Sequence, residues 1–284
     1  MSGAELNPGK HGSIIDEIGQ IIVHHVSNSG KLVELPTLFG IDFSISKHVI
    51  MLWVSAVVVF VVIYFATARY RKERYPVPRG FANAFESVVE YLRSHVVLPN
   101  VGKEDSKLWG PVVFTLFFFI LTANLLGLVP LFDLIPGGST PTGNFNVTAG
   151  LATVTFFSII IAGSIKHGFF GHWKGMIHPG LPIPVYFILI PIEIVGMFVK
   201  PFALTMRLAA NMTGGHIAIL SVMSFIFVFG EMFSPTVGVV VGAFVSVPLG
   251  VGIYALEIIV AFIQAFVFAL LTSIFVGIAI HPHH

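Results

Sequence analysis

The chain has 284 residues, of which 55% are hydrophobic and only 10% are charged, and its mean hydropathy is +0.91. This composition is typical of an integral membrane protein with several bilayer-spanning helices, and it excludes an ordinary soluble domain. The formal net charge of +1 argues against a nucleic-acid partner, and the lack of cysteine excludes disulfides, thiolate nucleophiles and cysteine-ligated clusters.

Residues 1–47 are predicted to form an N-terminal segment outside the membrane, followed by a single membrane domain at 48–284. The N-terminal segment lacks the charge, apolar core and cleavage site of a signal peptide, so we expect the first apolar run to be a retained span. About 20 apolar residues cross a hydrocarbon layer of about 30 Å. By this rule the spans are 48–68, 111–132, 147–165, 185–229 and 237–280.

The segment 81–98, between the first two spans, is predicted to be an amphipathic helix. Apolar side chains recur on it at helical spacing, with charged side chains opposite. The apolar set is Phe81, Phe85, Val88, Val89, Leu92 and Val96, and the charged set is Glu86, Glu90 and Arg93. Such a helix lies on the membrane surface or packs beneath it.

The loops predict the orientation of the chain. The stretch "RYRKERYPVPR" after the first span is strongly basic, and Lys166 and Lys174 follow the third span. The loops at 133–146 and 230–236 contain no Lys or Arg. Because basic loops stay on the cytoplasmic side, five spans place the N-terminus outside and the C-terminus in the cytoplasm.

The last two spans are too long to stand upright. At about 1.5 Å per residue each is about 65 to 70 Å long, about twice the apolar thickness. We therefore expect a strongly tilted helical hairpin, or one bent at Pro191, Pro201 and Pro248, with a partner surface beside it.

Polar side chains within this hairpin form the candidate site. In an antiparallel hairpin, two residues equally far from the turn lie at the same depth on facing helices. With the turn near residue 235, Arg207 is at the depth of Gln264 and His216 at the depth of Glu257. A second pattern is a helical stripe that leaves small residues around Arg207. The stripe contains Glu193, Lys200, Arg207, Asn211 and Gly214.

These residues are costly in a bilayer and have several interpretations. A charged residue at mid-bilayer costs about 2.5 to 3.5 kcal/mol and by default marks an ion or proton path. Arg207 could instead be salt-bridged or snorkel to an interface, and Lys200 and Glu193 could snorkel to the inner surface. His216 and Glu257 could lock two helices together, or they could exchange protons with water.

No other chemistry is supported by the sequence. His167, His172 and His178 share a loop, but their spacing matches no metal motif and favours a solvated basic loop. The sequence contains no HExxH, GxSxG or Walker-type motif, so we expect no cofactor, no metal and no catalysis by the chain alone.

The motifs "KPFALTMRLAANMTGGHIAIL" and "YALEIIVAFIQAFVFALLTSIF" resemble the last two membrane helices of subunit a of the rotary F-type ATP synthase. "FNVTAGLA" is similar to the start of an earlier span in that family. The resemblance extends from about residue 34 to the end.

The resemblance implies a proton-transporting stator of the Fo sector in a bacterial inner membrane or an equivalent energy-coupling membrane. The implied partners are a ring of c subunits, the peripheral-stalk b subunits and the rest of the complex. Arg207 would face the ring carboxylates beside Gln264. His216 and Glu257 would line the outer half-channel, and Glu193 with Asn211 the inner one.

Two departures from the family pattern occur. Many bacterial relatives have Glu at the position of His216 and His at that of Glu257. The histidine and the glutamate have thus exchanged helices in this chain, while the pair stays at the same depth. "RLAAN" also lacks the bulkier residue often found after Arg-Leu. Two alternatives remain: a secondary ion-coupled transporter, which usually has internal repeats and broken helices, and a structural membrane anchor.

Overall fold

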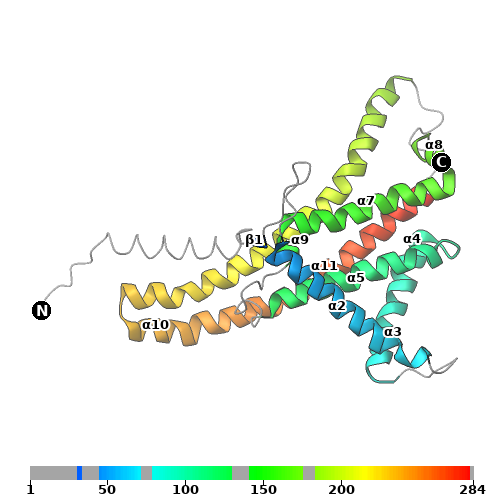
Figure 1. Ribbon diagram of the computed structural model, residues 1–284. Coiled ribbons are helices and arrows are strands. Elements are labelled where there is room, and N and C mark those ends of the chain that lie inside the picture. Colours follow the sequence, from blue (N-terminus) through cyan, green and yellow to red (C-terminus); the bar gives the residue numbers. More distant parts are fainter. Residues whose placement is uncertain (1–30, 34–44, 72–78, 130–140, 175–182, 282–284) are drawn as a thin grey trace, which may run out of the picture.

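The computed structural model describes residues 31–33, 45–71, 79–129, 141–174 and 183–281, which are almost entirely helical (Figure 1). Five helices in the described ranges are long and apolar enough to cross a membrane, which confirms the predicted all-α membrane fold and its five spans. Four of these spans are single helices: α2 (Lys47–Thr67), α5 (Ser106–Leu128), α7 (Phe145–His167) and α9 (Ile183–Met232). The fifth joins α10 (Pro235–Val241), a π-helical turn (Gly242–Ser246) and α11 (Val247–Ile280).

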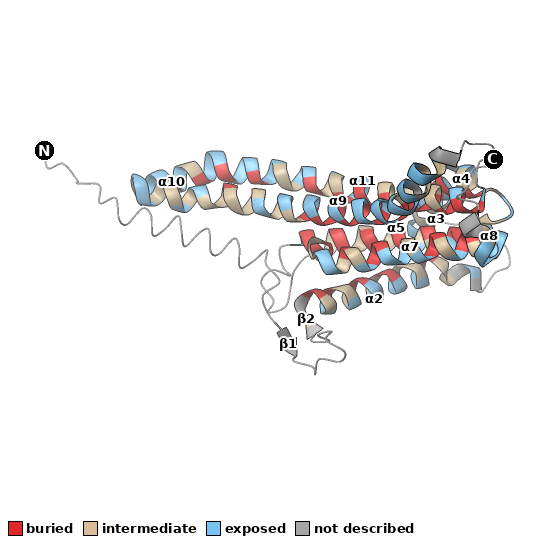
Figure 2. Cartoon of the chain, turned by 90° about the horizontal axis from the view of Figure 1, so that it is seen from above, coloured by how far each residue is buried: buried red, intermediate tan, exposed pale blue. Residues whose placement is uncertain are grey.

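The core of the bundle surrounds α11. One face of this helix carries Ala261, Ala265 and Ala269, each with 0% of its surface exposed, and it packs against α5, α7 and α9. Lipid removes most of the hydrophobic drive for helix association, so such small residues matter because they let neighbouring helices approach closely. Figure 2 shows the buried residues gathered where α5, α7 and α11 meet.

The boundaries of the second span differ from the predicted 111–132. Helix α5 begins at Ser106 and contains Pro111 in its interior, although proline is most easily accommodated at the start of a helix. It ends at Leu128, because Val129 adopts an extended conformation (φ −73°, ψ 110°).

Glycines end two of the helices at the same side of the bundle. Gly102 (φ 85°) ends α4 (Leu98–Val101), and Gly168 (φ 75°) ends α7, after which α8 (Phe169–Lys174) begins. On helix α2, a 3₁₀ turn (Ala68–Arg71) extends the C-terminal end. These positive φ values are readily adopted by glycine, so the chain can turn sharply there. In Figures 1 and 2, α4, α8 and the C-terminal end of α11 lie together.

The predicted amphipathic segment is one helical rod. It contains α3 (Phe81–Leu92), a π-helical turn (Arg93–Val97) and α4. Its second half buries Leu92, Val96 and Val97 in the core. The second half of this helix therefore packs against the bundle. In the first half, Phe81 is exposed.

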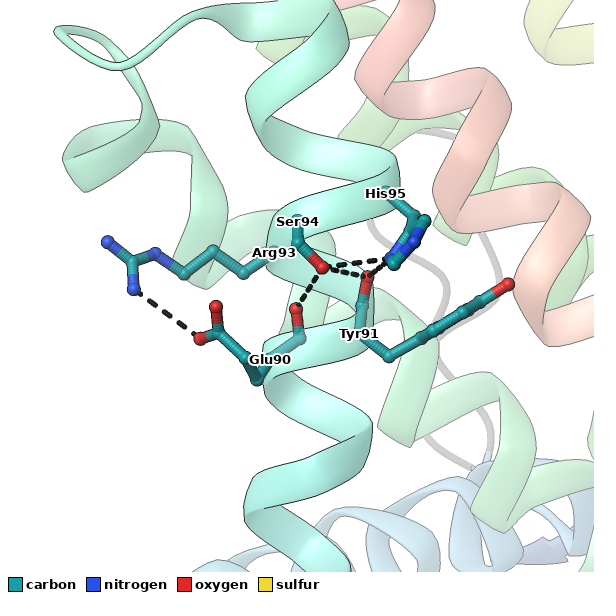
Figure 3. Close-up of polar contacts among 5 residues, drawn as sticks. All are labelled: Glu90, Tyr91, Arg93, Ser94 and His95. Carbon is teal, nitrogen blue, oxygen red and sulfur yellow. Dashed lines mark hydrogen bonds and ion pairs between the residues drawn. The ribbon is translucent and has the colours of Figure 1, made fainter.

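The polar side of this rod faces outward, as predicted (Figure 3). Arg93 Nη1 lies 3.4 Å from Glu90 Oε2, and both side chains are exposed. Ser94 Oγ donates to the Glu90 carbonyl at 2.7 Å, and the ring of Tyr91 stacks on His95. Because both side chains are exposed, this side of the helix is a solvated face, and the ion pair contributes at most about 1 kcal/mol to stability.

Each π-helical turn ends shortly before a proline. Pro99 follows the turn Arg93–Val97, and Pro248 follows the turn Gly242–Ser246. Proline cannot donate a hydrogen bond and its ring clashes with the carbonyl four residues earlier. The wider π-helical turn relieves this conflict without ending the rod.

Two features lie outside the predicted elements. A short antiparallel pair, β1 (Lys31–Val33) and β2 (Ile45–Ser46), precedes α2 within the segment predicted to lie outside. The other feature is a 3₁₀ turn (Pro141–Gly143) that leads into α7, where the side chain of Asn144 accepts from the Asn146 amide at 2.8 Å and caps the helix.

Helices α9 and α10–α11 form the predicted antiparallel hairpin. Ser234 caps α10 and accepts from Val237 N at 3.3 Å. Near the turn the helices approach so closely that a Cβ added to Gly238 would lie 2.6 Å from Gly230 Cα. The tip of the hairpin extends past the ends of α5 and α7 (Figure 2). Its tilt in a bilayer remains a prediction.

Candidate functional site

The centre of the candidate site is a contact between Glu257 on α11 and Gly215 on α9. The Glu257 side chain is buried, with 6% of its surface exposed. A Cβ atom added to Gly215 would overlap the carboxyl group, lying 2.6 Å from Glu257 Cδ. Neither carboxyl oxygen has a hydrogen-bond partner among the described residues.

His216 follows Gly215 directly on α9 and is half-buried. His216 thus lies one residue from the point where α9 approaches Glu257, and its pairing with Glu257 stays a prediction. A carboxyl group held between two helices with no fixed donor can accept or release a proton without breaking a hydrogen bond.

Gln264 is tied to Asn211 and not directly to Arg207. The Asn211 Nδ2 atom donates to Gln264 Oε1 at 3.1 Å, joining the two arms of the hairpin. Asn211 lies one helical turn after Arg207 on α9. Its partner Gln264 is therefore about one turn from Arg207 along the axis of α9. Gln264 is buried, with 5% of its surface exposed.

Arg207 on α9 is exposed. Within the described ranges no side chain forms an ion pair or a hydrogen bond with it, which disfavours an internal salt bridge there. Ala203, Ala210 and Gly214 on the same side are also exposed. The exposed surface of α9 thus presents Arg207 together with small residues one and two helical turns away.

The two remaining predicted residues, Lys200 and Glu193, precede Arg207 on α9. The Lys200 ammonium nitrogen lies 5.3 Å from the centroid of the Phe275 ring, a cation–π contact with α11. Glu193 belongs to α9, but its side chain lies outside the described part of the chain. Its predicted role is not tested by the geometry.

Sequence reasoning missed a buried polar cluster beside Glu257. Asn124 on α5 and Thr142 in the turn Pro141–Gly143 each have 0% of their surface exposed. Thr142 Oγ1 donates to Asn124 Oδ1 at 2.7 Å, and Tyr254 Oη donates to the Leu128 carbonyl at 2.6 Å. The available signal was Asn124 itself, the single amide side chain between Ser106 and Leu128.

The loop histidines show no metal-binding arrangement in the part that the structure describes. No group of three His, Cys, Asp or Glu side chains there is placed to hold a metal ion. The His167 Nε2 atom lies 2.9 Å from the Ile280 carbonyl oxygen, a contact at the end of α11. The side chains of His172 and His178 lie outside the described residues.

Comparison with known proteins gives one consistent result. Residues 49–277 match the family model described as the ATP synthase A chain. The chain is 43% identical to ATP synthase subunit a 2 of Chlorobium luteolum over 291 residues, covering 98% of this chain and 80% of that protein. It is 40% identical to ATP synthase subunit a of Chlorobium phaeobacteroides (99% and 82% covered) and 39% identical to that of Pelodictyon phaeoclathratiforme (97% and 80% covered).

Proposed function

The chain belongs to the ATP synthase A chain family, and on that premise we propose that it is the proton-translocating stator subunit of the membrane sector. The exposed guanidinium of Arg207, unpaired among the described residues, is the observation that supports this function best. Family membership also disfavours the secondary transporter and the structural anchor. As a transport subunit, the chain does not catalyse ATP synthesis by itself.

Arg207 is proposed to face the carboxyl groups of a ring of c subunits. Guanidinium remains protonated, so it acts as a fixed charge that stabilises an ionised carboxylate as it passes. It also repels a proton that would otherwise cross directly between the two sides. The small residues around Arg207 leave room for a ring helix to approach.

Glu257 and His216 are proposed to line the outer half-channel. A proton from the outside reaches this pair and then neutralises a ring carboxylate. Once neutral, the ring site enters lipid without the penalty of a buried charge. Gln264, held by Asn211, separates this region from Arg207.

The inner half-channel is assigned to the part of α9 that precedes His216. Glu193 is proposed to take the proton that the ring carboxylate releases near the cytoplasm. Asn211 lines the path without taking the proton, because its amide is not titratable, and Lys200 and Arg207 lie between these two residues on α9. Because the two half-channels are offset, a proton crosses only when the ring turns. Each elementary charge moved across 100 mV gains about 2.3 kcal/mol, which is the energy available for rotation.

The remaining proposals concern location and partners. The protein is multi-pass, and we propose a bacterial inner membrane or equivalent energy-coupling membrane, with the N-terminus outside. Besides the ring, we propose contacts with the peripheral-stalk b subunits. Purification of the tagged chain together with a multi-copy hydrophobic ring would support these assignments and distinguish them from a transporter acting alone.

The variant Arg207→Ala tests the function directly. In vesicles containing the whole complex, we expect ATP-driven acidification to be abolished while the complex still assembles. Arg93→Ala is the matched control, because Arg93 belongs to an exposed pair with Glu90 outside the spans (Figure 3). Full pumping by Arg207→Ala would refute the proposed function.

A further inference from the structure

Three side-chain hydrogen bonds connect α9 to α11 through the turn Pro141–Gly143. Thr213 Oγ1 on α9 donates to the Gly143 carbonyl at 3.1 Å. Thr142 Oγ1 donates to Asn124 Oδ1 at 2.7 Å. Asn124 Nδ2 then donates to the Ala261 carbonyl on α11 at 3.4 Å. We call these three bonds the polar bridge.

The polar bridge lies at the level of the buried carboxyl group. Thr213 is two residues before Gly215 on α9, and Ala261 is one helical turn after Glu257 on α11. One turn before Glu257, Tyr254 donates to the Leu128 carbonyl at the end of α5. The carboxyl group is therefore flanked along α11 by two polar attachments to α5.

The contact between Glu257 and Gly215 cannot set its own spacing. The carboxyl oxygens form no hydrogen bond among the described residues, and glycine offers only backbone atoms. Apolar contacts between membrane helices gain little from the hydrophobic effect, because lipid is equally apolar. Helix α9 is also the least buried of the five spans in the described ranges. Its distance from α11 must therefore depend on specific polar contacts nearby. The bond from Asn211 to Gln264 is one of them, one helical turn before Gly215, and the polar bridge is the set that lies at the level of Glu257.

The residues of the polar bridge are suited to this role. Asn124 accepts through Oδ1 and donates through Nδ2, so one side chain links the turn to α11 while remaining fully buried. Thr142 satisfies the acceptor and is fully buried as well. In an apolar bilayer an unpaired amide is costly, so Asn124 is held firmly between its two partners.

We propose that the polar bridge fixes the separation of α9 and α11 at Glu257, and that Asn124 and Thr142 are positioning residues for proton transfer there. The inference rests on the proposed function, because it takes Glu257 as a proton-carrying group. His216, next to Gly215, and Tyr254 are the other titratable side chains within one turn of the contact. Neither the turn Pro141–Gly143 nor the end of α5 at 124–128 adds another.

The test compares Thr142→Val with Thr155→Val in the complete ATP synthase complex. Both threonines are fully buried, and Thr155 Oγ1 pairs with Thr272 Oγ1 at 3.1 Å, so each variant removes one buried cross-element hydroxyl contact. Passive proton flux through the membrane sector is measured against pH and normalised to assembled complex. We expect Thr142→Val to lower the flux about 10-fold and to shift the pH of half-maximal flux. Thr155→Val should leave the pH profile unchanged.

Two further variants distinguish positioning from folding. Thr142→Ser retains the hydroxyl group and should restore the wild-type profile. Thr213→Val breaks the other end of the polar bridge and should shift the profile in the same direction as Thr142→Val. If Thr142→Val does not assemble, Thr213→Val provides the measurement. Failure of both to assemble, with a normal Thr155→Val, would assign these bonds to folding alone and overturn the inference.

The inference and the proposed function can fail separately. An unshifted pH profile in Thr142→Val, with transport still abolished in Arg207→Ala, would overturn only the positioning role. Retained pumping in Arg207→Ala would refute the proposed function first. A profile shifted equally by Thr155→Val would show that any loosened buried contact has this effect, and it too would overturn the positioning role.

Discussion

The Glu257 carboxyl group occupies the space that a side chain at residue 215 would fill. Its Cδ atom lies 2.6 Å from the position of a Cβ added to Gly215, which is too close for any real carbon contact. The absence of a side chain on α9 is therefore what allows a carboxyl group of α11 to be buried between the two helices.

The first prediction concerns this glycine. Gly215→Ala should displace the Glu257 carboxyl group, because the added methyl group would take its place and no hydrogen bond among the described residues holds the carboxyl oxygens there. We expect proton flux in vesicles to fall sharply. Gly252→Ala is the matched control on α11, since nothing lies within 4 Å of its added Cβ. Equal flux in the two variants would contradict the assigned packing.

The second prediction concerns the carboxyl group itself. Glu257→Gln keeps the size of the side chain but removes its ability to release a proton. Loss of a group that transfers protons typically lowers a rate by about 100-fold or more. We expect proton flux to fall by that order while the amount of assembled complex stays unchanged. Normal flux in this variant would exclude Glu257 from the proton path.

The third prediction concerns the bond between Asn211 and Gln264. A double-mutant cycle with Asn211→Leu and Gln264→Leu should give a coupling energy of about 0.6 kcal/mol, as is usual for hydrogen bonds between membrane helices. The free energy of unfolding in mixed micelles provides the measurement. Strictly additive effects would mean that the two side chains do not interact in the folded protein.

The fourth prediction concerns orientation. The chain contains no cysteine, so single cysteines can be introduced without a background signal. Glu231→Cys, near the hairpin turn, should react with a membrane-impermeant maleimide added outside. Lys103→Cys, between α4 and α5, should react only from the cytoplasmic side. Labelling of both from one side would be incompatible with the predicted topology.

The helical spans and the hairpin were predictable because long apolar runs have few alternatives in a bilayer. Counting from the turn also brought His216 and Gln264 close to their observed levels. Equal counting pairs Glu257 with His216 and Gln264 with Arg207, whereas the contacts on α9 are made by Gly215 and Asn211. The first contact lies one residue farther from the turn than counted and the second lies four residues nearer, so a single register does not describe both.

Other features could not be predicted from the same patterns. The role of Asn124 depends on Thr142, which is distant in sequence and lies in a short turn without hydrophobic periodicity. The strand pair at 31–33 and 45–46 is too short to give an alternating pattern. Pro248 suggested a bend, but a proline alone does not indicate whether the helix kinks or widens into a π-helical turn.

The length of α9 has a geometric consequence for the proposed rotating ring. A straight helix of 50 residues would be about 75 Å long, so one that stayed within an apolar layer of about 30 Å would be inclined by about 66° from the membrane normal. Arg207 and His216 would then differ by only about 5 Å in height but by about 12 Å sideways. A carboxyl group on the turning ring would thus pass Arg207 and His216 one after the other, at almost constant height in the membrane.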